Sequence, residues 1–85
     1  MKEFFYTITD KVGIHARPAG LLVKKASEFQ SDIKISKGDK TADAKKIFGI
    51  MSLAVKYDEQ VKISVNGSDE DLAVSELERF FKENL

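Results

Sequence analysis

The sequence predicts a small α+β domain in which helices cover one face of an antiparallel sheet. Three observations support this. Segments 32–37 and 61–65 alternate apolar with polar residues, which is typical of half-buried strands. Segments beginning at residues 18 and 68 carry apolar residues at helical spacing. The length of 85 residues suits one domain, so we expect a single domain over residues 1–85.

The first half of the chain predicts a strand, a loop and a helix. Residues 3–8 are aromatic and β-branched, which favours a strand, and residues 10–13 then form a loop. Pro18 suits the first turn of a helix, where its missing N–H costs nothing. We expect the core face of this helix to comprise Ala19, Leu22, Val23, Ala26 and Phe29.

The middle of the chain predicts a hairpin and a short helix. Residues 32–37 form a strand, Gly38 and Asp39 provide the turn, and residues 41–43 return. Residues 47–55 are almost wholly apolar and suggest a short helix.

After the strand at 61–65, the last helix is the clearest element. We expect Ser68 as its N-cap, and acidic residues at 69–71 suit the positive end of the helix dipole. Its apolar stripe consists of Val74, Leu77 and Phe81, with Ala73 and Phe80 beside it.

Composition excludes several functional classes. The 14 basic and 14 acidic residues give no net charge, which argues against a general nucleic-acid binder. With no Cys and one His, the chain lacks a disulfide, a thiol nucleophile and a Cys- or His-based metal site, so we expect no cofactor. No apolar stretch reaches the ~18 residues of a membrane span, and the N-terminus lacks signal-peptide features. We therefore expect a cytoplasmic protein that does not insert into membranes.

The neutral total combines two unlike segments. Residues 1–56 hold eleven basic and six acidic side chains, a net of +5, whereas residues 57–85 hold three and eight, a net of −5. A basic face is one interpretation, and ordinary solvation of the surface by charged side chains is the other.

The run from Gly13 to Gly20 is the candidate site. It places the only histidine, His15, just before a predicted helix start, where free N–H groups and the helix dipole bind anions. Arg17 adds a planar donor fork suited to phosphate oxygens. Such a site could accept a phosphoryl group on an imidazole nitrogen. The alternative is that His15 is an ordinary loop residue.

These residues resemble the HPr family, the histidine-containing phosphocarriers of the bacterial sugar phosphotransferase system. One matching run is Gly-Ile-His-Ala-Arg-Pro-Ala at residues 13–19, and a second is Lys-Lys-Ile-Phe-Gly-Ile-Met-Ser-Leu at residues 45–53. Length and element order agree over essentially the whole chain. The resemblance implies an open-faced β-sandwich, with a four-stranded antiparallel sheet covered on one face by three helices.

The resemblance also implies a carrier rather than an enzyme in the usual sense. His15 would take a phosphoryl group on Nδ1 from phosphorylated Enzyme I and pass it to EIIA domains of sugar permeases. Arg17 and the backbone N–H groups of Ala16 and Arg17 would stabilise the group. We expect a monomer. The sugar cannot be named, because other components select it.

Helical spacing predicts a partner face. Arg17, Gly20, Leu21 and Lys24 lie opposite the core stripe of their helix, although Leu21 alone could be an isolated surface leucine.

The short helix has too many apolar residues for one stripe. Ile50, Leu53 and Ala54 can serve the core, which leaves Ile47, Phe48 and Met51 for a patch; the alternative is that all are core. Lys24, Lys45 and Lys46 would surround this patch with positive charge. With the family match, the expected partner-binding residues are Gly20, Leu21, Lys24, Lys46, Ile47, Phe48, Gly49 and Met51.

One position departs from the family pattern. Many Gram-positive members carry a regulatory serine that a dedicated kinase phosphorylates, and here that position holds Lys46. We therefore expect this regulation to be absent. The alternative function is an HPr-like regulatory module that binds transcription factors or metabolic enzymes instead of serving sugar transport.

Overall fold

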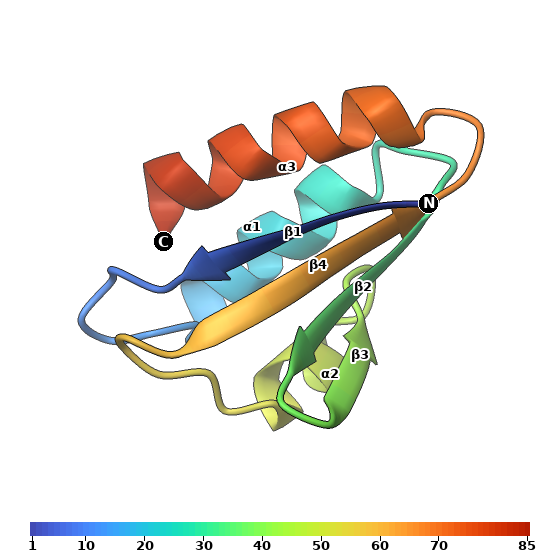
Figure 1. Cartoon of the computed structure of the whole chain (residues 1–85). Coiled ribbons are helices and arrows are strands. Elements are labelled where there is room, and N and C mark those ends of the chain that lie inside the picture. Colours follow the sequence, from blue (N-terminus) through green and yellow to red (C-terminus); the bar gives the residue numbers. More distant parts are fainter.

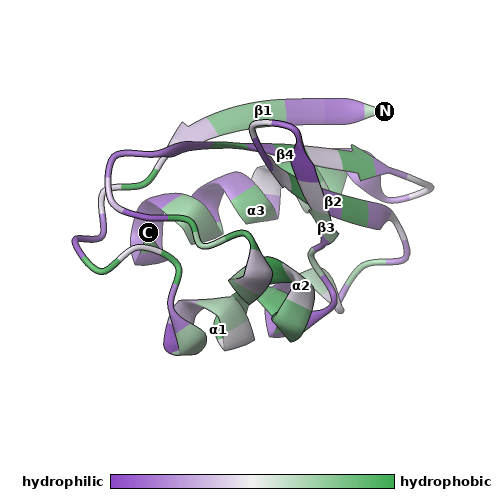
Figure 2. Ribbon diagram, turned by 90° about the horizontal axis from the view of Figure 1, so that it is seen from below, coloured by the Kyte–Doolittle hydropathy of each residue, from purple (hydrophilic) through white to green (hydrophobic).

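A computed structural model describes residues 1–85 and confirms the predicted fold: an antiparallel sheet with three helices on one face (Figure 1). The sheet has the order β1-β4-β2-β3, so the first strand lies beside the last. Seen from below, the sheet forms one layer and the helices the other (Figure 2). The elements are β1 (Lys2–Thr7), α1 (Ala16–Ala26), β2 (Asp32–Lys37), β3 (Lys40–Asp43), α2 (Ile47–Ser52), β4 (Gln60–Asn66) and α3 (Glu70–Asn84).

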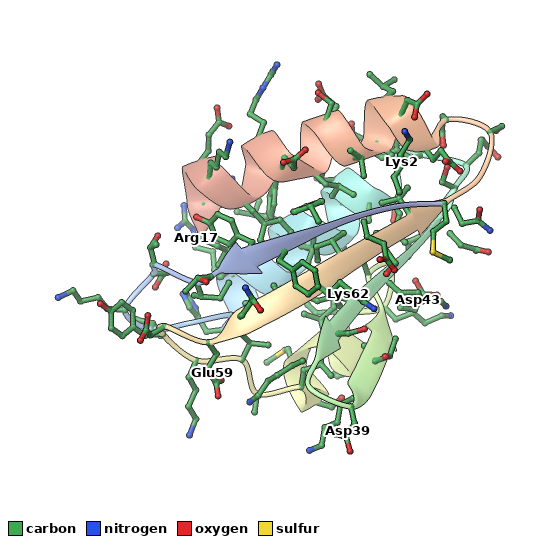
Figure 3. The ribbon with its side chains drawn as sticks, in the orientation of Figure 1. Lys2, Arg17, Asp39, Asp43, Glu59 and Lys62 are labelled. Atoms are coloured by element: carbon green, nitrogen blue, oxygen red, sulfur yellow. The ribbon has the colours of Figure 1, made fainter.

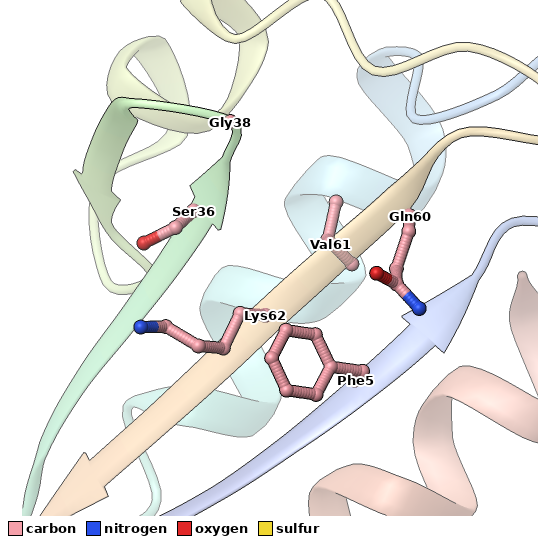
Figure 4. Close-up of a pocket in the computed structure, with 6 residues that line it drawn as sticks. All are labelled: Phe5, Ser36, Gly38, Gln60, Val61 and Lys62. Atoms are coloured by element: carbon pink, nitrogen blue, oxygen red, sulfur yellow. The ribbon is translucent and has the colours of Figure 1, made fainter.

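Alternation along the strands separates the two faces of the sheet. Val61, Ile63 and Val65 of β4 are buried, as alternation on a half-buried sheet requires. The opposite face is polar and open. The strand register places Phe5, Lys62, Ser36 and Thr41 in one row across it, and a shallow depression lies along part of this row (Figure 4).

The core lies between the sheet and the helices. Leu22 of α1 and Leu77 of α3 are fully buried. The Phe81 ring packs edge-on against Phe4 and Tyr6 of β1, with ring centroids 5.9 and 5.4 Å apart. These contacts fix α3 along β1, because edge-to-face aromatic pairs depend on orientation.

The start of α3 corrects one sequence prediction. The N-cap is Asp69, not Ser68, and Glu70 is the first helical residue. The Asp69 carboxylate accepts hydrogen bonds from the N–H of Gln30 and from the N–H and hydroxyl of Ser31. Asp69 is thus bound to a partner 38 residues away in sequence, a contact that local capping preference does not reveal.

The end of α2 corrects another. Ala54 was expected in the core, but it is exposed, because α2 stops at Ser52 and Ala54 adopts a left-handed conformation with φ 52°. Val55 is buried after it, with 3% exposure. Ile50 and Leu53 are buried as predicted.

The two charged segments do not separate in space. Ion pairs join Lys2 to Asp71, Lys25 to Glu76 and Lys37 to Glu59, and each pair links residues 1–56 to residues 57–85. None of the helices has the length and apolar character needed to cross a membrane.

Candidate functional site

His15 is the N-cap residue of α1. Its backbone is extended, with φ −96° and ψ −172°, and its side chain makes no capping hydrogen bond. The His15 carbonyl accepts the N–H of Ala19 at 3.0 Å, which is the first bond of the helix. The N–H groups before Ala19, at Ala16 and Arg17, have no intrahelical partner because a helix leaves its first donors free. The half-buried imidazole thus stands beside free N–H donors.

The loop before His15 is held from two sides. The Leu85 carbonyl accepts the N–H groups of Thr9 and Asp10 at 2.6 and 2.9 Å. On the other side, the N–H of Ile14 donates to the Val55 carbonyl at 3.0 Å. Sequence patterns identified His15 but not these carbonyls, because backbone acceptors carry no residue signature.

Arg17 follows His15 by two residues and is exposed. It takes part in none of the seven ion pairs of the structure. Figure 3 places it at the end of the molecule where β1 finishes. Its guanidinium therefore remains available to an anion that binds at the helix N-terminus.

The sequence around the site is free of acidic residues. There is no Asp or Glu between residues 11 and 27 or between residues 44 and 57. The first turn of α1 likewise contains none. The helix dipole and Arg17 therefore act together in favouring negative charge beside His15.

Exposed apolar side chains lie on α1 and α2. Phe48 is 85% exposed, Met51 40% and Leu21 38%, which confirms the predicted exposure of all three. The two helices lie side by side with their apolar segments close together (Figure 2). Gly20 faces α2 at this contact: a Cβ built there would lie 3.9 Å from the Cδ1 of Ile47, an ordinary van der Waals distance. We call Leu21, Phe48 and Met51 the apolar patch.

Two residues expected to bind partners, Ile47 and Gly49, face inward instead. Ile47 is only partly exposed and packs against the core. A Cβ built on Gly49 would point to the Cβ of Ala42 at 3.4 Å, so Gly49 brings α2 close to β3. The apolar side chain of Ile47 and the small size of Gly49 thus serve packing beneath the apolar patch.

The lysines around the apolar patch differ in whether the ammonium group is exposed or bound to the rest of the chain. Lys24 and Lys46 are exposed, as predicted. The ammonium of Lys45, by contrast, donates at 2.8 Å to the carbonyl of Phe29, which lies in the loop after α1. Lys45 therefore stabilises the junction of α1 and α2, and the free positive charge belongs to Lys24 and Lys46.

The comparisons with known proteins agree with this geometry. A family model described as "PTS HPr component phosphorylation site" matches residues 2–83. The phosphocarrier protein HPr of Lysinibacillus sphaericus is 46% identical over 91% of this chain and 88% of its own. The structure of HPr-C-His from Thermoanaerobacter tengcongensis has a TM-score of 0.92 at 45% identity, covering 96% of this chain and 92% of that one.

A further solved structure is that of Crh, a Bacillus subtilis catabolite repression protein described as a dimer with a swapping domain. Its TM-score is 0.78 at 38% identity, covering 94% of this chain and 92% of that one. With a family model matched over residues 2–83 and a phosphocarrier relative 46% identical, the chain belongs to the HPr family of the phosphotransferase system.

Proposed function

We propose that His15 is the phosphoryl acceptor of this HPr-family chain, and that it receives the group from phosphorylated Enzyme I and delivers it to EIIA domains. In the first transfer, the Nδ1 lone pair of His15 attacks phosphorus, and the bond from phosphorus to Enzyme I breaks as the new N–P bond forms. In the second transfer, an acceptor group on EIIA attacks phosphorus and the His15 N–P bond breaks. No oxidant or metal is consumed.

The observation that carries this proposal is the position of His15 at the N-cap of α1, where its side chain makes no capping hydrogen bond. A phosphoryl group on its imidazole would bring negative charge to the free N–H groups of Ala16 and Arg17 and to the Arg17 guanidinium. The same donors serve both transfers, because a carrier must hold the group without trapping it.

The apolar patch is proposed as the docking surface for both partners. Leu21, Phe48 and Met51 supply apolar area, and a methionine adapts to more than one partner surface. Lys24 and Lys46 favour acidic partners and would raise the rate of encounter.

Phosphorylation with Enzyme I and phosphoenolpyruvate tests the proposal. The chain should gain one acid-labile phosphoryl group, and His15→Ala should gain none. Arg17→Ala should slow the transfer by roughly a hundredfold, as expected for loss of a donor to the transition state. Arg79→Ala is the matched control, because Arg79 is an exposed arginine on α3. A His15→Ala protein that still accepts the group would refute the assignment.

A regulatory role without sugar transport is the second candidate, and the likeness to Crh favours it. In that case, phosphorylated chain would bind a regulatory protein and transfer nothing to EIIA. Incubating the phosphorylated protein with EIIA domains separates the two functions. The expected monomer remains a prediction, because a solved relative is described as a dimer; sedimentation would decide it.

A further inference from the structure

The loop that carries His15 rests directly on residues 53–59, which connect α2 to β4 and which we call the strap. Gly13 has φ 79°, and a Cβ built there would lie 2.4 Å from the Val55 carbonyl oxygen and 2.8 Å from the Cα of Lys56. Ile14, which is 6% exposed, donates its N–H to the same Val55 oxygen. The His15 N–H in turn donates to the Gly13 carbonyl at 3.1 Å. A shift of the strap would therefore move the backbone of His15.

The strap has no regular structure of its own. Two of its residues, Ala54 and Asp58, adopt positive φ values of 52° and 70°, which are unfavourable for residues other than glycine. Val55 and Leu53 anchor it to the core, while four of its seven side chains are exposed. Polar contacts must fix the remainder, because little apolar area is buried there.

Lys37 and Glu59 provide those contacts. The Lys37 ammonium, at the end of β2, lies 3.0 Å from the Ala54 carbonyl oxygen and 3.0 Å from Oε1 of Glu59. The same Oε1 accepts the N–H of Lys56 at 2.7 Å. Lys37 and Glu59 thus bind the strap at Ala54 and at Lys56, the residues on either side of Val55. Glu59 lies at the same end of the molecule as Arg17 (Figure 3).

Two further observations show how the strap is held in place. Hydrogen bonds from Lys37 and from the N–H of Lys56 hold the pKa of Glu59 below its ordinary value. The backbone of the strap also pairs with the end of β1: the N–H of Ile8 donates to the Glu59 carbonyl at 3.0 Å, and the N–H of Asp58 donates to the Ile8 carbonyl at 2.9 Å. These bonds fix the far end of the strap. At its near end the N–H of Ala54 donates to the Met51 carbonyl at 3.1 Å, and Lys37 is the side chain that binds the Ala54 carbonyl.

We infer that Lys37 and Glu59 are positioning residues for phosphoryl transfer at His15, and that they act through the strap and the Ile14–Val55 hydrogen bond. This inference rests on the proposed function. Neither residue needs to touch the phosphoryl group or the partner. They hold the Val55 carbonyl where it fixes Ile14, so that His15 stands correctly at the N-terminus of α1.

The test compares Lys37→Met with Lys34→Met. Lys34 is an exposed lysine on the same strand and forms none of the ion pairs of the structure, so it is the matched control. With this chain as the varied substrate of Enzyme I, Lys37→Met should lower kcat roughly tenfold, because a small misplacement of a reacting group is costly. The KM should stay within about twofold, since the apolar patch is unchanged.

Two further readouts exclude a merely structural role. Amide hydrogen exchange at Ile14 should accelerate in Lys37→Met and remain as in the wild type in Lys34→Met. Lys37→Arg should restore both kcat and Ile14 protection. If Lys37→Met does not fold, as judged by circular dichroism, Glu59→Gln serves in its place, because it removes the charge and keeps the shape.

The outcomes are distinct from those of the proposed function. A wild-type chain that Enzyme I cannot phosphorylate refutes the proposed function and, with it, the positioning role. A wild-type chain that is phosphorylated, together with a folded Lys37→Met protein that matches Lys34→Met in kcat and Ile14 exchange, refutes the positioning role alone.

Discussion

The N-termini of α1 and α3 are opposites. At α3, the cap is Asp69, and Glu70 and Asp71 occupy the first turn, where they oppose the positive end of the helix dipole. The Glu70 carboxylate also accepts the N–H of Gly67 at 3.1 Å. At α1, the cap is His15, no side chain caps the helix, and the first turn has no acidic residue. Neither N-cap side chain bonds the first N–H groups of its helix, so the two ends differ in charge: α3 has acidic residues at its positive end and α1 has none.

The two ends differ in what they contribute to stability. The carboxylates at α3 contribute to folding, because they bind donors of the same chain. The first turn of α1 has no such carboxylate, and a carboxylate near a helix N-terminus stabilises the helix by about 0.3–1 kcal/mol. Under the proposed function, the absence of a carboxylate at α1 favours phosphoryl binding, since an internal carboxylate would compete for the same donors.

The largest expected effect is the loss of stability caused by Gly67→Ala, which would disrupt the contacts at the N-terminus of α3. A Cβ there would lie 2.6 Å from the Cα of Ser31 and would separate Ser31 from Asp69. We expect a loss of about 2 kcal/mol in the free energy of unfolding, measured in urea, as for other overpacked positions. Gly38→Ala is the control: φ is 60° and nothing lies within 4 Å, so strain alone should cost about 1 kcal/mol. Equal losses in the two variants would contradict the proposed clash.

Acid should weaken the same end of the molecule. The Ser31 hydroxyl and the Gln30 N–H hold the pKa of Asp69 below its ordinary value. A lowered pKa means that the folded state favours the carboxylate, so this contribution is complete above the unfolded pKa, near 3.8, and is lost as the pH falls through the lower folded value. The free energy of unfolding should therefore decline below about pH 4. Asp69→Asn should be less stable at pH 7 and should show a shallower acid decline.

The most informative change at the other end is His15→Asp, which places an aspartate at the N-cap position of α1, as in α3. We expect about 1 kcal/mol of added stability, because aspartate caps a helix and opposes its dipole. Phosphorylation by Enzyme I should be abolished. His15→Ala should lose phosphorylation without this gain in stability. If His15→Asp is no more stable than His15→Ala, the N-terminus of α1 is already satisfied and the comparison fails.

The contrast between the two ends also explains what sequence could predict. Strand alternation, Pro18 and the spacing of Leu77 and Phe81 are local patterns, and the fold inferred from them is confirmed. The position of His15 before α1 was visible for the same reason. Asp69 as the cap of α3 was missed, because its partners Gln30 and Ser31 are distant in sequence.

The inward-facing residues of α2 illustrate a second limit. Spacing showed that some apolar residues of this helix must be exposed, and Phe48 and Met51 are. It could not show that Gly49 faces Ala42, because that depends on where β3 lies. Side chains on a six-residue helix are assigned to a face by tertiary packing more than by periodicity.

The smallest effect concerns Lys46, the N-cap of α2, which makes no capping bond and places positive charge at the positive end of the helix. Lys46→Ser should raise the free energy of unfolding by about 0.5 kcal/mol, because serine caps a helix. It also supplies a hydroxyl at the position where the family resemblance implies a regulatory serine. Incubated with an HPr kinase and ATP, Lys46→Ser should become labelled and the wild type should not. Stable serine phosphate on the wild-type chain would show that another residue, such as Ser52, replaces the missing serine.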